Sequence, residues 1–288
     1  MGLPKLLLIR GLGHSGTTIL DLALGAHPQI VGLGEAARIL EKPRPGEEQR
    51  GPARLRAELR HQRICTCGLT ADLCPVWGEL LTWLPQHDHL PLPSKFERLI
   101  QAVQLHAQQQ AEPVEWLVDS YQDDLVLPFA ALPELDVRVL FLVRDVRSWV
   151  HSRARDGRNK GKALPATRAF LRWVRLNQRL EARLRQCGKP LFHLGYEELA
   201  LAPEQALSSV CSWLGLEFSA AMLTPGPCST SHILAGNRVR FDPTRSRAIR
   251  YDASWMQGSG WPASIAMGWP GLAALNRRLV YANGWLSK

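Results

Sequence analysis

The chain has 288 residues, of which 45% are hydrophobic, and its formal net charge is +9. This length suits one large α/β domain or two small ones, and we expect a single domain over residues 1–288. No stretch approaches the roughly 20 apolar residues that cross a bilayer, which excludes a membrane-spanning protein. The first apolar run, Leu6–Ile9, is short and is followed by Arg10, so we expect no secretory signal and a cytoplasmic protein.

The positive charge is concentrated in two stretches. Residues 144–162 contain seven cations and two acids, and residues 238–250 contain five cations and one acid, so these stretches account for the whole net charge. An anionic ligand near them is a better interpretation than a generally basic surface. Nucleic acid is the competing anion. We expect no nucleic-acid partner, because the sequence contains no recognised nucleic-acid-binding module and no basic repeat interleaved with aromatic residues.

Residues 6–21 have the pattern of a buried strand, a glycine-rich turn and the start of a helix. In the turn, Gly11-Leu-Gly-His-Ser-Gly-Thr-Thr18, glycines let the backbone bend around an anion, and the first N–H groups of the helix point at it. The spacing nearly matches the Walker A pattern, but Thr17 stands where that pattern has a phosphate-binding lysine. This argues against ordinary nucleoside triphosphate chemistry. The alternative is a turn that only joins strand to helix.

The next strand, around Ile30 and Val31, is followed by a carboxylate at Glu35. Ligands of open parallel sheets bind beyond the carboxyl ends of the strands, so Glu35 is the candidate general base. The alternative is that Glu35 only stabilises the N-terminus of a helix over residues 36–40.

Residues 41–112 are predicted to form a lid-like insertion that carries acceptor specificity. Its first part is rich in Pro, Gly and charged residues, and its last part has the apolar stripe of a helix over residues 95–110, capped by Ser94.

Three cysteines of this insertion, Cys65, Cys67 and Cys74, lie within ten residues of one another. Their spacing is not that of a standard zinc motif. Reduced structural cysteines are the first interpretation, a zinc site with a fourth ligand such as His61 is the second, and a disulfide is the third, because the cytosol is reducing.

Two further strands end in polar residues. The strand over residues 115–119 ends in Asp119, as a Walker B strand would, which keeps a nucleotide or small-molecule kinase as an alternative. Residues 137–143 form the strongest strand pattern and run directly into Arg144. Arg144 can form a bidentate pair with a phosphate, and Ser152, about two helical turns later, can donate its hydroxyl. Alternatively, Arg144 pairs with Asp145 or Glu35, and Ser152 has no special role.

Helices are predicted over residues 166–186 and 203–214, with a last strand over residues 190–194 between them. The segment 216–288 has no clear periodicity and is expected to be irregular.

These motifs, in this order, resemble those of the sulfotransferases that use 3′-phosphoadenosine-5′-phosphosulfate (PAPS), and a segment similar to Cys65–Trp77 recurs in some bacterial members. The glycine loop resembles the family's 5′-phosphosulfate loop, although His14 stands where relatives usually have Lys or Arg. Arg144 and Ser152 match the 3′-phosphate motif, and Tyr196 matches a tyrosine that lies against adenine. The residues that the resemblance assigns to the cofactor are Gly13, His14, Ser15, Gly16, Thr17, Thr18, Arg144, Ser152, Tyr196, Asn237, Arg238 and Arg240.

The resemblance implies an α/β, P-loop-like three-layer fold, with a central parallel sheet of about five strands and helices on both faces. It also implies sulfuryl transfer from PAPS to a hydroxyl or amine, with 3′,5′-ADP (PAP) as product, Glu35 as base and no metal required. His14 would donate a hydrogen bond to the leaving phosphate oxygen, and residues 216–288 would complete the cofactor site. The acceptor would be a small molecule, a carbohydrate or a lipid. Because the chain departs from the family at His14 and at Tyr121-Gln122, a catalytically degenerate binding module is a further alternative.

Overall fold

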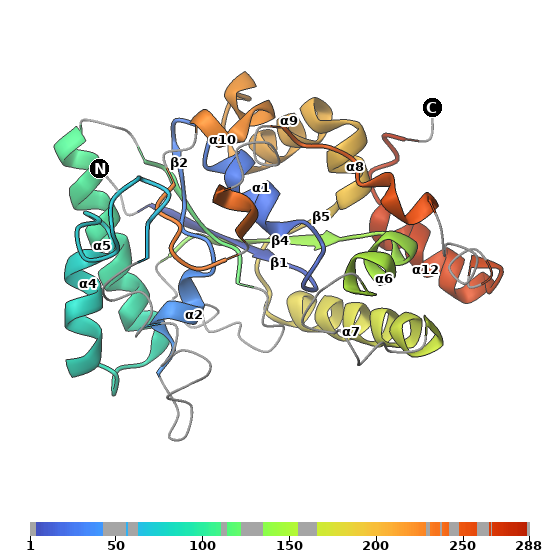
Figure 1. Cartoon of the computed structure of the whole chain (residues 1–288), viewed down its shortest axis with the longest axis horizontal. Helices are drawn as coiled ribbons and strands as arrows, with labels where there is room; N and C mark the ends of the chain where they lie inside the picture. Colours follow the sequence, from blue (N-terminus) through green and yellow to red (C-terminus); the bar gives the residue numbers. More distant parts are fainter. Residues whose placement is uncertain are drawn as a thin grey trace. The chain divides into compact units, whose positions relative to one another are not determined.

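The computed structural model describes residues 4–42, 56, 63–110, 114–121, 135–154, 166–228, 231–236, 238–241, 248–257, 265 and 267–286. Its strands are β1 (Lys5–Arg10), β2 (Ile30–Gly32), β3 (Trp116–Asp119), β4 (Val137–Val143) and β5 (Leu191–Gly195). Its α-helices are α1 (Thr17–Leu24), α2 (Ala36–Leu40), α4 (Gly78–Trp83), α5 (Leu92–Gln110), α6 (Val146–Ala154), α7 (Ala166–Gln186), α8 (Tyr196–Leu201), α9 (Pro203–Leu214), α10 (Pro225–Cys228) and α12 (Pro270–Val280) (Figure 1). Short 3-10 helices are η1 (Leu84–Gln86), η4 (Ala220–Leu223), η5 (Arg238–Phe241) and η6 (Ala253–Met256).

The strands form one five-stranded sheet in the order β2-β3-β1-β4-β5. The pairs β1–β3, β2–β3 and β4–β5 are parallel, with Leu8 opposite Asp119 and Val143 opposite Gly195. The apolar run 6–9 of β1 and residues 139–143 of β4 are buried, as expected of parallel strands that are covered on both faces. The predicted α/β class with a central parallel sheet is confirmed.

The chain divides into two compact units. The first unit consists of Met1–Ile9, Thr18–Arg138 and Ser219–Ala248, and the second consists of Arg10–Thr17, Val139–Phe218 and Ile249–Lys288. The single domain over residues 1–288 stays a prediction.

In the first unit, the short helix α2 is held at both ends. At its N-terminus, Asp119 Oδ1 accepts a hydrogen bond from the Ala37 N–H at 2.9 Å. At its C-terminus, Arg56 and Lys95 donate to carbonyl oxygens of the last turn, at 2.9 and 3.2 Å. This charge distribution complements the helix dipole. Helix α5 packs on α2 and on α4. The fold therefore fixes α2, and with it the residue that precedes it, Glu35.

In the second unit, helices cover both faces of β4 and β5, with α7 on one side and α8 and α9 on the other (Figure 1). Helix α6 packs on α7, and α12 packs on β5. At the end of β5, a Cβ on Gly195 would lie 1.7 Å from the carbonyl oxygen of Val280, so α12 can approach this closely only over a glycine. The indole of Trp173 on α7 donates to the Arg144 carbonyl at 3.0 Å, which anchors the end of β4.

The element boundaries test several predictions. The strand over residues 137–143 and the helices over 166–186 and 203–214 are confirmed. The predicted helix with Ser94 as its cap is wrong at its start, because α5 begins at Leu92 and Pro93 occupies its first turn, where a missing N–H is tolerated. The C-terminal segment is less irregular than predicted, since it contains α12. Among the described residues, no helix has the length and apolar character needed to cross a membrane.

Candidate functional site

The loop between β1 and α1 has an unusual backbone. A Cβ on Gly11 would lie 2.3 Å from the carbonyl oxygen of Leu142, so the loop can pass this close to β4 only at a glycine. His14 has a φ of 75° and is the sole non-glycine residue with a positive φ in the described part of the chain. A non-glycine residue in this region costs about 1–3 kcal/mol, and such strain concentrates at functional sites. The strain therefore singles out His14 within the loop.

Arg144, directly after β4, joins this loop to the rest of the second unit. Only 6% of the residue is exposed. Its guanidinium donates to the His14 carbonyl at 3.1 Å, to the Asp252 carboxylate at 3.0 Å and to the Ser148 hydroxyl. The guanidinium also lies over the ring of Tyr196, 4.6 Å from its centroid. These contacts fix a cation beside the loop.

Helix α6 presents three side chains to the same place. Ser148 and Ser152 are four residues apart and thus lie on one face of the helix. The Ser152 hydroxyl is 3.4 Å from His14 Nδ1, and the Trp149 indole donates to the Gly13 carbonyl at 2.9 Å. The structure therefore brings Gly13, His14, Arg144, Ser152 and Tyr196 together, as the motif order suggests.

The other predicted loop residues, Ser15 to Thr18, directly follow His14 in the chain. The Ser15 N–H donates to the Leu12 carbonyl at 3.0 Å, and the side chain of Ser15 is buried. Gly16 has a φ of 94°, a value that favours glycine. Thr17 begins α1, whereas Thr18, the next residue of that helix, belongs to the first unit.

Two groups beside Arg144 differ in their protonation. Burial raises the pKa of the Tyr196 hydroxyl, which stays a neutral donor and bonds to the Arg250 carbonyl at 3.0 Å. Burial acts against ionisation of Asp252 as well, but hydrogen bonds from Ser254 and Arg144 hold the pKa of that carboxyl below its ordinary value. The ionised Asp252 thus balances part of the charge of Arg144. Its side chain is 41% exposed, so an anionic ligand can replace it as a partner.

The alternative pairing of Arg144 with Asp145 is not what the structure contains. Asp145 is buried and forms a two-point ion pair with Arg147, at 2.8 and 2.9 Å, and also accepts from Asn276 at 2.9 Å. Burial opposes its ionisation, but these partners lower the pKa of the Asp145 carboxyl. With Asp145 satisfied in this way, Arg144 is directed to the loop and to Asp252.

This arrangement suits a tetrahedral oxyanion. The buried guanidinium, the hydroxyls of Ser148 and Ser152 and the imidazole of His14 are the hydrogen-bonding groups that phosphate and sulfate oxygens prefer. The N–H groups at the start of α1 add donors of the same kind. The residues present therefore fit the phosphates of an adenosine 3′-phosphate cofactor.

Glu35 lies in the first unit, directly before α2. Its carboxylate accepts from Arg38 at 2.8 Å and makes no capping hydrogen bond to the helix, where Asp119 serves instead. The Glu35 N–H donates to the Ala235 carbonyl at 3.0 Å, and Gly34, with a φ of 65°, lets the chain turn there. Main-chain contacts with the segment 231–236 thus hold Glu35 in place.

Of the predicted cofactor residues Asn237, Arg238 and Arg240, only Arg240 has a described side chain. Arg240 is buried and donates to the carbonyls of Gly236 and Leu234, at 2.7 and 2.9 Å, which stabilises its own turn. Arg238 belongs to η5, but its side chain and all of Asn237 lie outside the described residues. Their contact with a cofactor stays a prediction.

Asp119 bears on the kinase alternative. The residue is fully buried, and the hydrogen bond it accepts from Ala37 ties β3 to α2. A structural bond of this kind explains an aspartate at the end of β3 without a magnesium ion.

Three residues of the site, Ser148, Trp149 and Asp252, are not among the predicted ones. Ser148 could have been found, because it precedes Ser152 by four residues on the same predicted helix. Trp149 follows no pattern that points to a loop. Asp252 lies 108 residues after Arg144, in a segment without periodicity, so no local signal connects the two.

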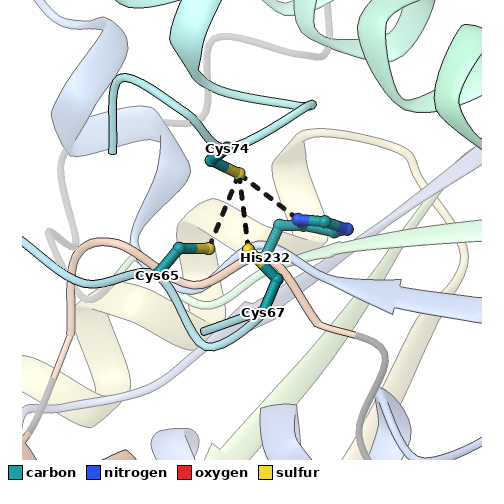
Figure 2. A group of neighbouring side chains, drawn as sticks. All are labelled: Cys65, Cys67, Cys74 and His232. Carbon is teal, nitrogen blue, oxygen red and sulfur yellow. Dashed lines mark hydrogen bonds between the residues drawn. The ribbon is translucent and has the colours of Figure 1, made fainter. Parts of the chain in front are cut away.

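A second group of polar side chains lies in the first unit. Cys65, Cys67 and Cys74 are free thiols, and their sulfur atoms lie with a ring nitrogen of His232 within 4.8 Å of one another (Figure 2). The sulfur of Cys74 is 3.7 Å from that of Cys65 and 3.9 Å from that of Cys67, too far for a disulfide. His61, the ligand considered from the sequence, lies outside the described residues.

Comparison with known proteins identifies the family. The model of the sulfotransferase family matches residues 7–220. The chain is similar in structure to the sulfotransferase domain from the curacin biosynthetic pathway, with a TM-score of 0.48 and 20% identity over 94% of this chain and 92% of that one. For the sulfotransferase domain of the Synechococcus PCC 7002 olefin synthase, the TM-score is 0.49 and the identity 20%, over 99% and 96% of the two chains. For the sulfotransferase STF1 of Mycobacterium tuberculosis H37Rv, the TM-score is 0.44 and the identity 18%, over 77% of this chain and 70% of that one. Among curated proteins, no match to the chain is found.

Proposed function

The chain belongs to the sulfotransferase family, and we propose that it transfers a sulfuryl group from PAPS to a hydroxyl or amine of an acceptor and releases 3′,5′-ADP. The observation that carries the proposal is the contact of Arg144 with the glycine loop, through the His14 carbonyl at 3.1 Å. A buried cation held at this place by Ser148 and Tyr196 suits the 3′-phosphate, which PAPS carries and 5′-AMP lacks.

In this proposal, the second unit supplies most of the residues that bind the cofactor. Arg144 and the hydroxyl of Ser152 hold the 3′-phosphate, and the ring of Tyr196 lies against adenine. The loop residues Gly13 to Thr17, with Thr18 after them, donate hydrogen bonds to the 5′-phosphosulfate. Asn237, Arg238 and Arg240 give a second grip on the 3′-phosphate.

The reaction is an in-line displacement at sulfur. The acceptor oxygen or nitrogen forms a bond to sulfur while the bond between sulfur and the 5′-phosphate oxygen breaks, and the electron pair of that bond stays on the departing 3′,5′-ADP. Glu35 takes the acceptor proton, and its ion pair with Arg38 orients the carboxylate. His14 donates a hydrogen bond to the leaving phosphate oxygen, and the loop N–H groups stabilise the charge that develops there. These groups supply donors and positive charge without a metal ion.

The acceptor is proposed to be a small molecule, a carbohydrate or a lipid. The insertion over residues 41–112 is where its specificity would reside, and parts of this segment lie outside the described residues.

A transfer assay tests the proposal. With PAPS that carries ³⁵S in the sulfuryl group and a panel of phenols, sugars, lipids and amines, we expect labelled product and stoichiometric 3′,5′-ADP. Consumption of Mg-ATP in place of PAPS would support the kinase alternative. Affinity for 3′,5′-ADP without transfer to any member of a broad panel would support the binding module.

A further inference from the structure

The first unit contains a cluster of four metal-binding side chains that the proposed reaction does not use. Three thiols come from the segment 63–77, at Cys65, Cys67 and Cys74, and the imidazole of His232 comes from a segment more than 150 residues later in the chain (Figure 2). Cys65, Cys74 and His232 are buried, whereas Cys67 is exposed. The four donor atoms nevertheless converge, as Figure 2 shows.

The distances from the Cys74 sulfur to the other three donor atoms match those of a tetrahedral zinc site. A zinc ion about 2.3 Å from each sulfur of a tetrahedron holds the sulfur atoms about 3.8 Å apart, and holds a sulfur and a histidine nitrogen about 3.6 Å apart. The sulfur of Cys74 lies 3.7 Å from that of Cys65, 3.9 Å from that of Cys67 and 3.3 Å from Nδ1 of His232. All four donor atoms lie within 4.8 Å of one another, and three sulfurs and one nitrogen form a complete ligand set for zinc.

The backbone around the thiols is itself fixed. The Cys65 N–H donates to the Leu69 carbonyl at 2.8 Å, and the Cys74 N–H donates to the Thr70 carbonyl at 2.9 Å. Gly68 has a φ of 88°, which allows the tight turn between the first two cysteines and Thr70. These hydrogen bonds and this turn hold the thiols of the loop in place.

The histidine is positioned by the groups around it. The Trp77 indole donates to the His232 carbonyl at 2.6 Å, and the His232 N–H donates to the Gly32 carbonyl at 2.8 Å. The Thr66 hydroxyl bonds to the main chain on both sides of His232, at 2.5 and 2.8 Å. The ring of His106 stands edge-on to that of His232, with the centroids 5.1 Å apart. These contacts direct Nδ1 of His232 toward the sulfurs.

We propose that Cys65, Cys67, Cys74 and His232 bind one zinc ion in a closed structural site. Because all four positions of the tetrahedron are taken by protein, no position is left for water or substrate, which is typical of structural rather than catalytic zinc. The ion fastens the segment 63–77 to the segment 231–236, whose residue Ala235 accepts the hydrogen bond from Glu35. The site does not depend on the proposed sulfuryl transfer, and a failure of either leaves the other standing.

Metal analysis of the full chain tests the zinc site. After purification under reducing conditions and dialysis against metal-free buffer, we expect about one zinc ion per chain by inductively coupled plasma mass spectrometry. A Cys67→Ser variant changes the exposed ligand and leaves the buried packing intact, so it should fold and lose most of the zinc. The matched control is Cys187→Ser, at a half-buried free cysteine outside the cluster, which should keep the zinc of the unmodified chain.

Cobalt gives a second readout. The chain refolded with Co²⁺ should show the visible absorption of a tetrahedral site together with thiolate-to-metal charge transfer, and His232→Asn should change that spectrum. Absence of zinc from the reduced chain, even after incubation with excess zinc, would overturn the proposal. So would equal zinc content in the Cys67→Ser variant and the unmodified chain, or iron in place of zinc.

Discussion

The region around the glycine loop and Arg144 differs from the region around Glu35 and the thiol cluster in how its polar groups are held. Around the glycine loop, Arg144 is held by a carbonyl, a hydroxyl and the partly exposed carboxylate of Asp252, all partners that a ligand can replace. Around Glu35, the main chain is held by backbone hydrogen bonds to the segment 231–236, and the neighbouring thiols converge on one point. The first region can exchange its partners, whereas the second is fixed. We therefore expect changes in the first region to alter affinity for the nucleotide, except at His14, whose proposed role is in turnover. We expect changes in the second region to alter turnover or stability.

The largest effect expected from the second region is that of Glu35→Gln. If Glu35 is the base, turnover should fall about 100-fold or more, because general base catalysis contributes at least this much. Affinity for 3′,5′-ADP should not change, since the cofactor contacts lie on other residues. The two quantities are measured by the transfer assay and by calorimetric titration.

The control for this prediction is Glu97→Gln, at an exposed glutamate of α5. Unchanged turnover in Glu35→Gln would remove Glu35 as the base. A loss of affinity for 3′,5′-ADP in that variant would contradict the expectation that the second region does not contribute to nucleotide binding.

A smaller effect, in the first region, is expected of His14→Gly. Glycine adopts the φ of 75° without strain, so this substitution removes the imidazole and leaves the loop backbone in place. We expect about a tenfold loss in turnover, the scale of one hydrogen bond to a developing charge, with no loss in the free energy of unfolding.

His14→Lys sharpens the same prediction, because lysine restores the charge that relatives usually carry, and it should retain turnover. Full activity in the glycine variant would show that the His14 side chain has no part in the reaction. Thermal unfolding of both variants separates this outcome from a folding defect.

The smallest expected effect is the dependence of the free energy of unfolding on pH, which involves one buried carboxyl group in each unit. Burial raises the pKa of Asp21 to about 7, and burial together with the charge of Asp145 raises that of Glu197 to about 7. In each case the folded protein holds a proton that the unfolded chain releases from about pH 4 upward. The free energy of unfolding should therefore decrease as the pH rises from about 4 to 7, by at most about 1.4 kcal/mol per pH unit for each group.

Denaturant titrations at several pH values check this prediction. Asp21→Asn and Glu197→Gln should each make the dependence on pH less steep, while the exposed control Glu97→Gln should leave it unchanged. A stability that increases between pH 4 and 7 in the unmodified chain and in both variants would contradict it.

Much of the fold follows from local patterns in the sequence. The apolar, β-branched run 137–143 and the regular stripe of 166–186 specify β4 and α7 directly, because interior strands and amphipathic helices have distinct periods. The predicted start of α5 after Ser94 is wrong, because Ser94 is a good cap but Pro93 is tolerated in a first turn, so the helix begins at Leu92. The helix α12 over residues 270–280 lies in a segment that is predicted to be irregular.

The residues of the two sites also fall into those that the sequence predicts and those that it does not. Arg144 and Ser152 are predictable since a strand end and a helix of known pitch determine where they lie relative to each other. Asp252 and His232 are not, because each comes from an irregular segment and meets its partner only after the chain has folded, 108 and 158 residues away. Long-range partners of this kind are determined by tertiary packing rather than by spacing.

Calorimetric titration with 3′,5′-ADP, compared with 5′-AMP and with Mg-ATP, tests the proposed function most directly. We predict micromolar affinity for 3′,5′-ADP. Removing the 3′-phosphate, as in 5′-AMP, or the guanidinium, as in Arg144→Ala, should weaken binding about 100-fold or more. Arg175→Ala, at an exposed arginine of α7, is the matched control and should bind like the unmodified chain. Preference for Mg-ATP, or equal affinity for 3′,5′-ADP in Arg144→Ala and the unmodified chain, would contradict the account.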